Sequence, residues 1–230
     1  MIVIGFLSQK GGSGKSTLAR LFGAEYVADT ASPVYIADMD TKQATSSEWA
    51  ASRREAELGD IPCGVHASVG EAIRAAADAQ ILIFDGAPHA SEQTLEIAQA
   101  CDLVVIPSGP ALDDLKPAVR LAHELANSGL DEGTIRFCLF RVDADAQAET
   151  REACNYLQGA GYEVIRGALE DKPSYRRALD AGRSPAETVA VRHGRPYERL
   201  NRAAAEMADD MARQLLDRAM MRLKPDKKED

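Results

Sequence analysis

One glycine-rich run, Gln9–Thr17, constrains the fold of this 230-residue chain more than any other feature. It follows the apolar run Ile2–Leu7, which predicts a buried strand, and it opens a helical pattern over Lys15–Ala28. A strand, a turn ending in Gly-Lys-Ser and a helix are typical of a phosphate loop, where backbone N–H groups and the helix N-terminus bind phosphate oxygens. We expect Lys15 to reach the β- and γ-phosphates and Ser16 to place its hydroxyl on Mg²⁺. The residues expected to bind the nucleotide are Gly11, Gly12, Ser13, Gly14, Lys15, Ser16 and Thr17.

Short apolar runs alternate with longer helical patterns through most of the chain. The expected strands are Ile2–Leu7, Val34–Ala37, Gly64–His66, Ile81–Phe84, Leu103–Ile106, Ile135–Phe140 and Glu163–Arg166. The expected helices are Lys15–Ala28, Ser46–Glu57, Val69–Ala79, Ser91–Ala100, Asp113–Ser128, Ala146–Gly159, Ser174–Ala181 and Pro196–Leu223. This rhythm predicts an α/β fold with a doubly wound, mostly parallel sheet flanked by helices. We expect one domain over residues 1–223 and a charged, disordered tail over 224–230.

Composition excludes several classes of protein. The formal net charge of −9 argues against a protein that coats nucleic acid over its whole surface, and the 5% aromatic content weakens a base-stacking mode of binding. The four cysteines lack the spacing of a zinc or iron–sulfur site, so we expect reduced thiols in the cytoplasm. No signal peptide pattern follows Met1, and no apolar stretch approaches the ~20 residues of a membrane span.

Three aspartates follow expected strands. Asp38 and Asp40 come after the second strand, and residues two apart on an extended segment point the same way. Asp85 ends the strand that begins at Ile81, which is typical of a Walker B carboxylate. Because ligands of open α/β sheets bind at the carboxyl ends of the strands, we expect the three carboxylates to face the nucleotide. An acidic turn that caps the next helix is the simpler alternative for Asp38 and Asp40.

Lys10 departs from the ordinary phosphate loop, since a second lysine precedes the glycines and Gln9 stands where the first glycine is usual. The form Lys-Gly-Gly-x-Gly-Lys-Ser resembles the deviant Walker A motif of the ParA/MinD superfamily of ATPases. The resemblance runs from Met1 to roughly Leu115 and includes Pro107–Leu115, which is similar to a segment that helps shape the family's dimer face. The alternative for this segment is a plain loop between a strand and a helix. Beyond it the similarity is looser, at Arg141 and Tyr175–Gly182.

The resemblance implies ATP and Mg²⁺ as cofactors and a homodimer that closes on ATP. Lys10 would cross the dimer interface to the partner's nucleotide and, with Lys15 and Asp40, would be catalytic. Asp40 would orient the attacking water, while Asp38 and Asp85 would join Ser16 around the metal. The chain departs from the family at Thr41-Lys42, where Pro-Gln is usual, and at Ala87, where a proline is usual.

An arginine-rich stretch lies between Lys172 and Arg202, with eight cations against three acids and a local charge of +5. Family members bind DNA without sequence preference through this region, and phosphate contacts suffice for such binding. The residues expected to contact DNA are Arg176, Arg177, Arg183, Arg192, Arg195 and Arg199. The alternative is a solvated surface with scattered ion pairs.

Together these features predict a ParA-like ATPase of the short, ParF-like type that partitions plasmid DNA. It would act on the nucleoid in the cytoplasm and respond to a ParB-like activator. One alternative is a MinD-like regulator on a membrane surface, which would use the helical pattern ending at Leu223; we expect no stable membrane association. Another is a ParA-like ATPase that positions a cargo other than DNA. Relatives of nitrogenase iron protein or dethiobiotin synthetase are disfavoured, because nothing near Cys101 supports a cluster and the synthetase has no need of Lys10.

Overall fold

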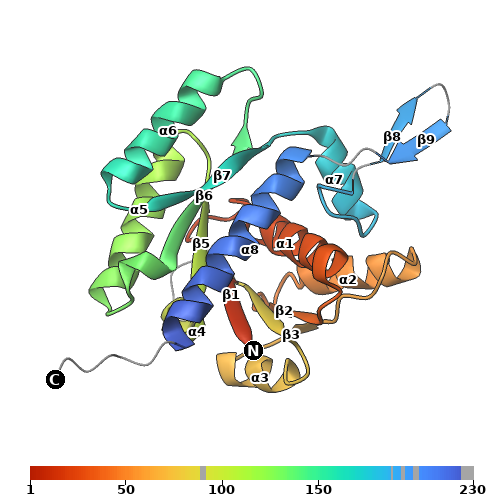
Figure 1. The fold of residues 1–230 in the computed structure, drawn as a ribbon, viewed down its shortest axis with the longest axis horizontal. Coiled ribbons are helices and arrows are strands. Elements are labelled where there is room, and N and C mark those ends of the chain that lie inside the picture. The colour runs from red at the N-terminus through yellow and green to blue at the C-terminus, as the bar shows by residue number, and fades with distance from the viewer. Residues whose placement is uncertain (89–91, 188, 193–194, 199–201, 224–230) are drawn as a thin grey trace.

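Seven parallel strands form the sheet at the centre of the molecule (Figure 1). The computed structural model describes residues 1–88, 92–187, 189–192, 195–198 and 202–223. The strands are β1 (Ile2–Phe6), β2 (Val34–Asp38), β3 (Cys63–Val65), β4 (Ile81–Asp85), β5 (Leu103–Ser108), β6 (Ile135–Val142) and β7 (Glu163–Glu170), in the order β3-β2-β4-β1-β5-β6-β7. The central strands β1, β4 and β5 are nearly continuous runs of Ile, Val, Leu and Phe because helices cover both of their faces.

The helices cover the two faces of the sheet. They are α1 (Lys15–Thr30), α2 (Thr45–Glu55), α3 (Val69–Ala75), α4 (Glu92–Ala100), α5 (Leu112–Asn127), α6 (Gln147–Gly159), α7 (Pro173–Asp180) and α8 (Arg202–Leu223). One core cluster joins α1, α2, α7 and α8 to one face, and the other joins α3 to α6 to the opposite face. The result is a three-layered, doubly wound α/β architecture, as the sequence predicts.

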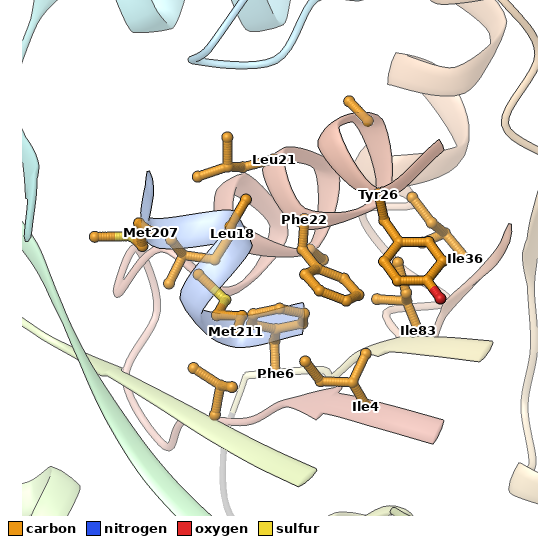
Figure 2. Close-up of a cluster of buried hydrophobic side chains, with 14 of the residues drawn as sticks. Ile4, Phe6, Leu18, Leu21, Phe22, Tyr26, Ile36, Ile83, Met207 and Met211 are labelled. Atoms are coloured by element: carbon orange, nitrogen blue, oxygen red, sulfur yellow. The ribbon is translucent and has the colours of Figure 1, made fainter. Parts of the chain in front are cut away.

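The core beneath α1 and α8 is built around aromatic side chains whose rings pack at a tilt to one another. Figure 2 shows Phe22 of α1 above Phe6 of β1, with ring centroids 6.3 Å apart, and Tyr26 beside Phe22. Met207 and Met211 of α8 fill the adjoining space and are fully buried. This packing fixes α1 against β1, and therefore fixes the loop that connects them.

The carboxyl-terminal part differs from the sequence prediction. The expected helix Pro196–Leu223 is wrong in its first turns: Pro196 lies in β9 (Arg195–Glu198), which pairs antiparallel with β8 (Val189–Arg192), and α8 begins at Arg202. Alternating valines in β8 favour the extended pairing over a helix. The expected tail, residues 224–230, lies outside the described residues, and no helix among the described residues is long and apolar enough to cross a membrane.

Strand order places the functional segments together. β1 lies between β4 and β5. The strands β2, β3 and β4 lie on one side of β1 within the sheet, and β5, β6 and β7 lie on the other. A crevice forms at the carboxyl ends of the strands where the order reverses. Asp38 and Asp85, the last residues of β2 and β4, are register partners, and Phe6 of β1 is the partner of Asp85 on its other side. Two expected metal-site residues thus meet next to the glycine-rich loop.

Candidate nucleotide-binding site

The glycine-rich loop curls between β1 and α1 with its backbone turned toward solvent. Gly12 and Gly14 have φ of 72° and 104°, in the left-handed region that favours glycine. A Cβ on Gly14 would lie 2.6 Å from the ring of Phe140, so this position excludes any side chain. Gly14 is the N-cap of α1 and has no side-chain cap. The first N–H groups of the helix therefore remain directed at the space in front of the loop.

Lys15 and Ser16 stand at the start of α1. Lys15 is buried, with 7% of its surface exposed, and its ammonium makes a long contact of 3.5 Å with the Lys10 carbonyl oxygen. Burial lowers the pKa of Lys15, while Asp85 and Asp40 oppose that shift. The Ser16 hydroxyl donates to Oδ1 of Asp85 at 3.0 Å. The structure thus brings together the cation, the hydroxyl and the carboxylate that sequence reasoning assigned to phosphate and metal.

Asp85 lies at the bottom of this arrangement, almost completely buried. Burial raises its pKa to about 6, while hydrogen bonds from Ser46 and Ser16 and the charge of Arg20 oppose the rise. The Ser46 hydroxyl donates to Oδ2 of Asp85 at 2.6 Å. The two hydroxyls hold the carboxylate from both sides and orient its oxygens.

Asp38 and Asp40 play different parts. Asp38 is buried, and its Oδ2 accepts the backbone N–H groups of Ser46 and Ser47 in the first turn of α2. Burial raises the pKa of Asp38, opposed by these N–H donors. Asp40 is half-buried and accepts the N–H groups of Lys42 and Gln43. Asp40 lines the cavity described below, whereas Asp38 anchors the helix that carries Ser46.

Lys10 points away from its own loop toward α5. Its ammonium pairs with Asp114, and about half of its side chain is exposed. The neighbouring Gln9 side chain donates to Glu124 of the same helix at 2.7 Å. The start of the loop is therefore held by α5, which follows the Pro107–Leu115 segment.

Sequence reasoning missed Ser46 and Arg20. Arg20 is buried on α1, its Nε donates to Ser46 Oγ at 3.1 Å, and its guanidinium lies over Trp49. Burial lowers the pKa of Arg20, opposed by the charges of Asp85 and Asp38. An arginine four residues after Ser16 lies on the same helix face, and that spacing in an apolar helix is the signal that could have identified it.

A cavity of about 260 Å³ opens in front of these groups. Its lining comprises Gly11, Gly12, Ser13, Gly14, Lys15, Ser16, Thr17, Asp40, Gln43, Thr45, Gly86, Pro88, Phe140 and Arg141. Every residue that the sequence predicts to bind nucleotide is among them. Within the described chain, the buried hydroxyl of Ser13 lacks a hydrogen-bond partner, which fits a ligand in the cradle. The oxygen donors Ser16 and Asp85 suit Mg²⁺, a hard cation that prefers oxygen ligands.

The arginine-rich stretch lies on and after α7, and none of its described residues lines this cavity. Arg176 and Arg177 are exposed on α7, and Arg176 pairs with Asp171 at 3.1 Å. Arg183 follows the helix and is half-buried, and its carbonyl accepts the Trp49 indole N–H at 3.0 Å. Arg192 and Arg195 are register partners in the β8–β9 pair, and the structure describes only their backbone. Arg199 lies outside the described residues.

Comparison with solved structures agrees on the fold. The cell-division protein MinD of Pyrococcus horikoshii with Mg-ADP superposes with a TM-score of 0.70 at 14% identity, over 94% of this chain and 98% of that one. An ATP complex of Cyanothece McdA(D38A) gives 0.65 at 14% identity over 94% and 96%. A Borrelia burgdorferi protein described as a plasmid partition protein, bound to AMPPNP, gives 0.62 at 13% identity over 96% and 99%. No protein-family model and no curated protein sequence matches the chain. These likenesses establish the P-loop fold of the MinD and ParA structures.

Proposed function

We propose that this chain is a Mg²⁺-dependent ATPase of the ParA/MinD type. The observation that carries the proposal is that Lys15, Ser16 and Asp40 line one cavity in front of the phosphate loop, while the buried Asp85 accepts a hydrogen bond from Ser16 beneath it. Loop N–H groups and Lys15 bind the phosphates, Ser16 and Asp85 hold the metal with Asp38 supporting that shell, and Asp40 orients a water molecule for attack on the γ-phosphate. Mg²⁺ held there would neutralise charge that develops on the phosphate oxygens.

The enzymatic part is tested by phosphate release with ATP and Mg²⁺. Lys15→Ala should lose nucleotide binding, and Asp40→Ala should keep binding within threefold but lose at least tenfold in turnover. Asp78→Ala, at an exposed aspartate outside the cavity, is the matched control. Full turnover by Asp40→Ala would contradict the role given to that carboxylate.

We further propose that residues 1–223 act as one domain that dimerises on ATP and partitions DNA. Lys10 extends to the partner's nucleotide, the exposed arginines on and after α7 bind DNA phosphates, and a ParB-like protein stimulates hydrolysis. The supporting observation is that Arg176 and Arg177 are exposed beside one another in a stretch of charge +5. The proposed cargo is a plasmid, and the DNA that the arginines bind is that of the nucleoid. The proposed site of action is the cytoplasm.

The DNA assignment is tested by measuring DNA affinity with ATP, ADP or no nucleotide across a salt series. Arg176→Glu with Arg177→Glu should abolish ATP-dependent binding and leave ATP affinity unchanged. The charge-matched control is Arg120→Glu with Arg151→Glu, on α5 and α6, where the salt slope should stay as in the wild type. Because the slope falls by about one for each phosphate contact removed, an unchanged slope in the α7 variant would reject this surface.

One observation favours a second candidate, a MinD-like membrane contact. Leu216, Met220 and Met221 near the end of α8 are 40%, 61% and 59% exposed. Leu216→Gln with Met220→Gln leaves the buried Met211 and Leu215 in place. The membrane function would be favoured if the wild type sediments with anionic liposomes in the presence of ATP and the variant does not. It would be excluded if the wild type does not sediment with them.

A further inference from the structure

Arg141 has an unusual backbone conformation beside the candidate site. Its φ is 59°, in the left-handed region that an arginine rarely adopts. The residue sits at a bulge in β6: Phe140 pairs with Leu169 and Val142 with Glu170, which leaves Arg141 between two shifted registers. Bulges of this kind redirect a side chain, and strained residues that persist cluster at functional sites. We therefore look for a function of the Arg141 side chain that accounts for this backbone conformation.

The redirected side chain points at the phosphate loop. The Arg141 guanidinium carbon lies 5.5 Å from the ring centroid of Phe140, the ring that packs against Gly14. One terminal nitrogen, Nη1, lies 3.9 Å from where a Cβ on Gly12 would be. Arg141 is exposed and lines the same cavity as the loop, and no carboxylate in the described part of the chain forms a salt bridge with it. A permanent cation therefore stands at the rim of the cradle with its donors available.

We propose that Arg141 binds the phosphate groups of the nucleotide in this cavity. A guanidinium presents a planar fork of N–H donors that matches phosphate oxygens, and it keeps its charge when water is displaced. Lys15 supplies a buried cation from the floor of the cavity, whereas Arg141 supplies one from the β6 side. The bulge places the guanidinium there, and the Phe140 ring supports it. This inference rests on nucleotide binding at the site.

Calorimetric titration with ATP, ADP and pyrophosphate tests the proposal on the full chain with Mg²⁺ present. Arg141→Ala should weaken binding of ATP and of pyrophosphate at least tenfold, as expected for the loss of a charge-assisted contact. Arg141→Lys should recover part of the affinity, because it restores charge without the fork. Arg120→Ala, at an exposed arginine on α5, should bind as the wild type does. Weaker ATP binding with unchanged pyrophosphate binding would mean a contact to the base or sugar, and would overturn the proposal.

A stability measurement separates binding from a structural role. Glycine adopts a positive φ without strain, so Arg141→Gly should unfold at the same or a higher urea concentration while its ATP affinity falls at least tenfold. A lower unfolding midpoint together with the lost affinity would show that Arg141 supports the fold, and would overturn the proposal. If the wild type binds ATP and Arg141→Ala binds within twofold of it, this inference fails and the proposed function stands. If the wild type itself fails to bind ATP, both fail.

Discussion

The hydroxyl of Ser46 donates a 2.6 Å hydrogen bond to Oδ2 of Asp85, across the space between α2 and the end of β4. Both residues are fully buried, and Ser46 in turn accepts the Nε–H of Arg20. Ser46 is also tied to β2, because its backbone N–H donates to Asp38. One serine therefore connects α1, α2, β2 and β4 at the candidate metal site.

Replacing this hydroxyl should perturb Asp85. Ser46→Ala removes a donor to a buried carboxylate, so we expect the pKa of Asp85 to rise above about 6 and the free energy of unfolding to fall by about 1–2 kcal/mol. Urea unfolding gives the stability, and Mg²⁺ titration of the nucleotide complex gives the effect on the site. Ser52→Ala, whose hydroxyl donates to the Glu48 carbonyl on the same helix, is the control. Equal stability of the two variants would contradict the assignment.

Glu25 predicts a dependence of stability on pH. Burial, and then the charges of Glu187, Asp29 and Asp209, raise its pKa to about 7 from an ordinary 4.5. Between pH 4.5 and about 7 the folded state binds more protons than the unfolded state. The stability contributed by protonated Glu25 is therefore present at low pH and is lost as the pH rises through about 7.

Glu25→Gln should therefore be more stable than the wild type at pH 8, by about 3 kcal/mol, and should lose most of that advantage by pH 5. Urea unfolding at the two pH values measures it. Glu152→Gln, at an exposed glutamate on α6, serves as the control. A constant difference between Glu25→Gln and the wild type across the pH range would rule out titration of Glu25 as the cause.

The pair between Lys10 and Asp114 should oppose dimerisation, since the proposed dimer needs Lys10 to leave α5. An exposed ion pair stabilises by at most about 1 kcal/mol, and the dimer breaks one such pair in each protomer, so Asp114→Ala should tighten ATP-dependent dimerisation by up to about thirtyfold. Sedimentation velocity with ATP measures the change. Asp113→Ala, in the same first turn of α5 and exposed, controls for net charge. Weaker dimerisation of Asp114→Ala would instead indicate that Asp114 belongs to the interface.

Arg53 joins α2 to the segment after α7. It contacts both carboxylate oxygens of Glu187, at 2.7 and 2.8 Å, and donates to the carbonyls of Gly182 and Leu58. Because Arg53 is buried, Arg53→Ala should lower the free energy of unfolding by about 3–5 kcal/mol.

The neighbouring Arg54 provides the comparison for that measurement. Arg54 pairs with Asp60 at the surface, so Arg54→Ala should lower the free energy of unfolding by less than about 1 kcal/mol. Thermal or urea unfolding of the two variants side by side measures both values. Similar losses in the two variants would show that the ion pair between Arg53 and Glu187 contributes little to the free energy of unfolding.

Local patterns predicted most of the elements because they depend on residues close in the sequence. The seven strands of the main sheet are confirmed, and the loop between β1 and α1 follows from its glycines. The β8–β9 pair escaped prediction because Pro196 and Tyr197 sit directly before a long helical pattern. Asp38 and Asp40 share a spacing that suggests one role, yet the fold gives them different partners, because only Asp38 lies beneath the first turn of α2.

The sequence alone determined the phosphate loop, the alternation of strands and helices, and the three aspartates at strand ends, since each depends on periodicity or on backbone freedom within a few residues. Only the tertiary structure decided which groups meet. Register pairing of β2 with β4 brings Asp38 beside Asp85, packing of α2 delivers Ser46 to Asp85, and the bulge in β6 turns Arg141 toward Gly12. These contacts join segments far apart in the chain, and strand register and helix packing over the shared core set them.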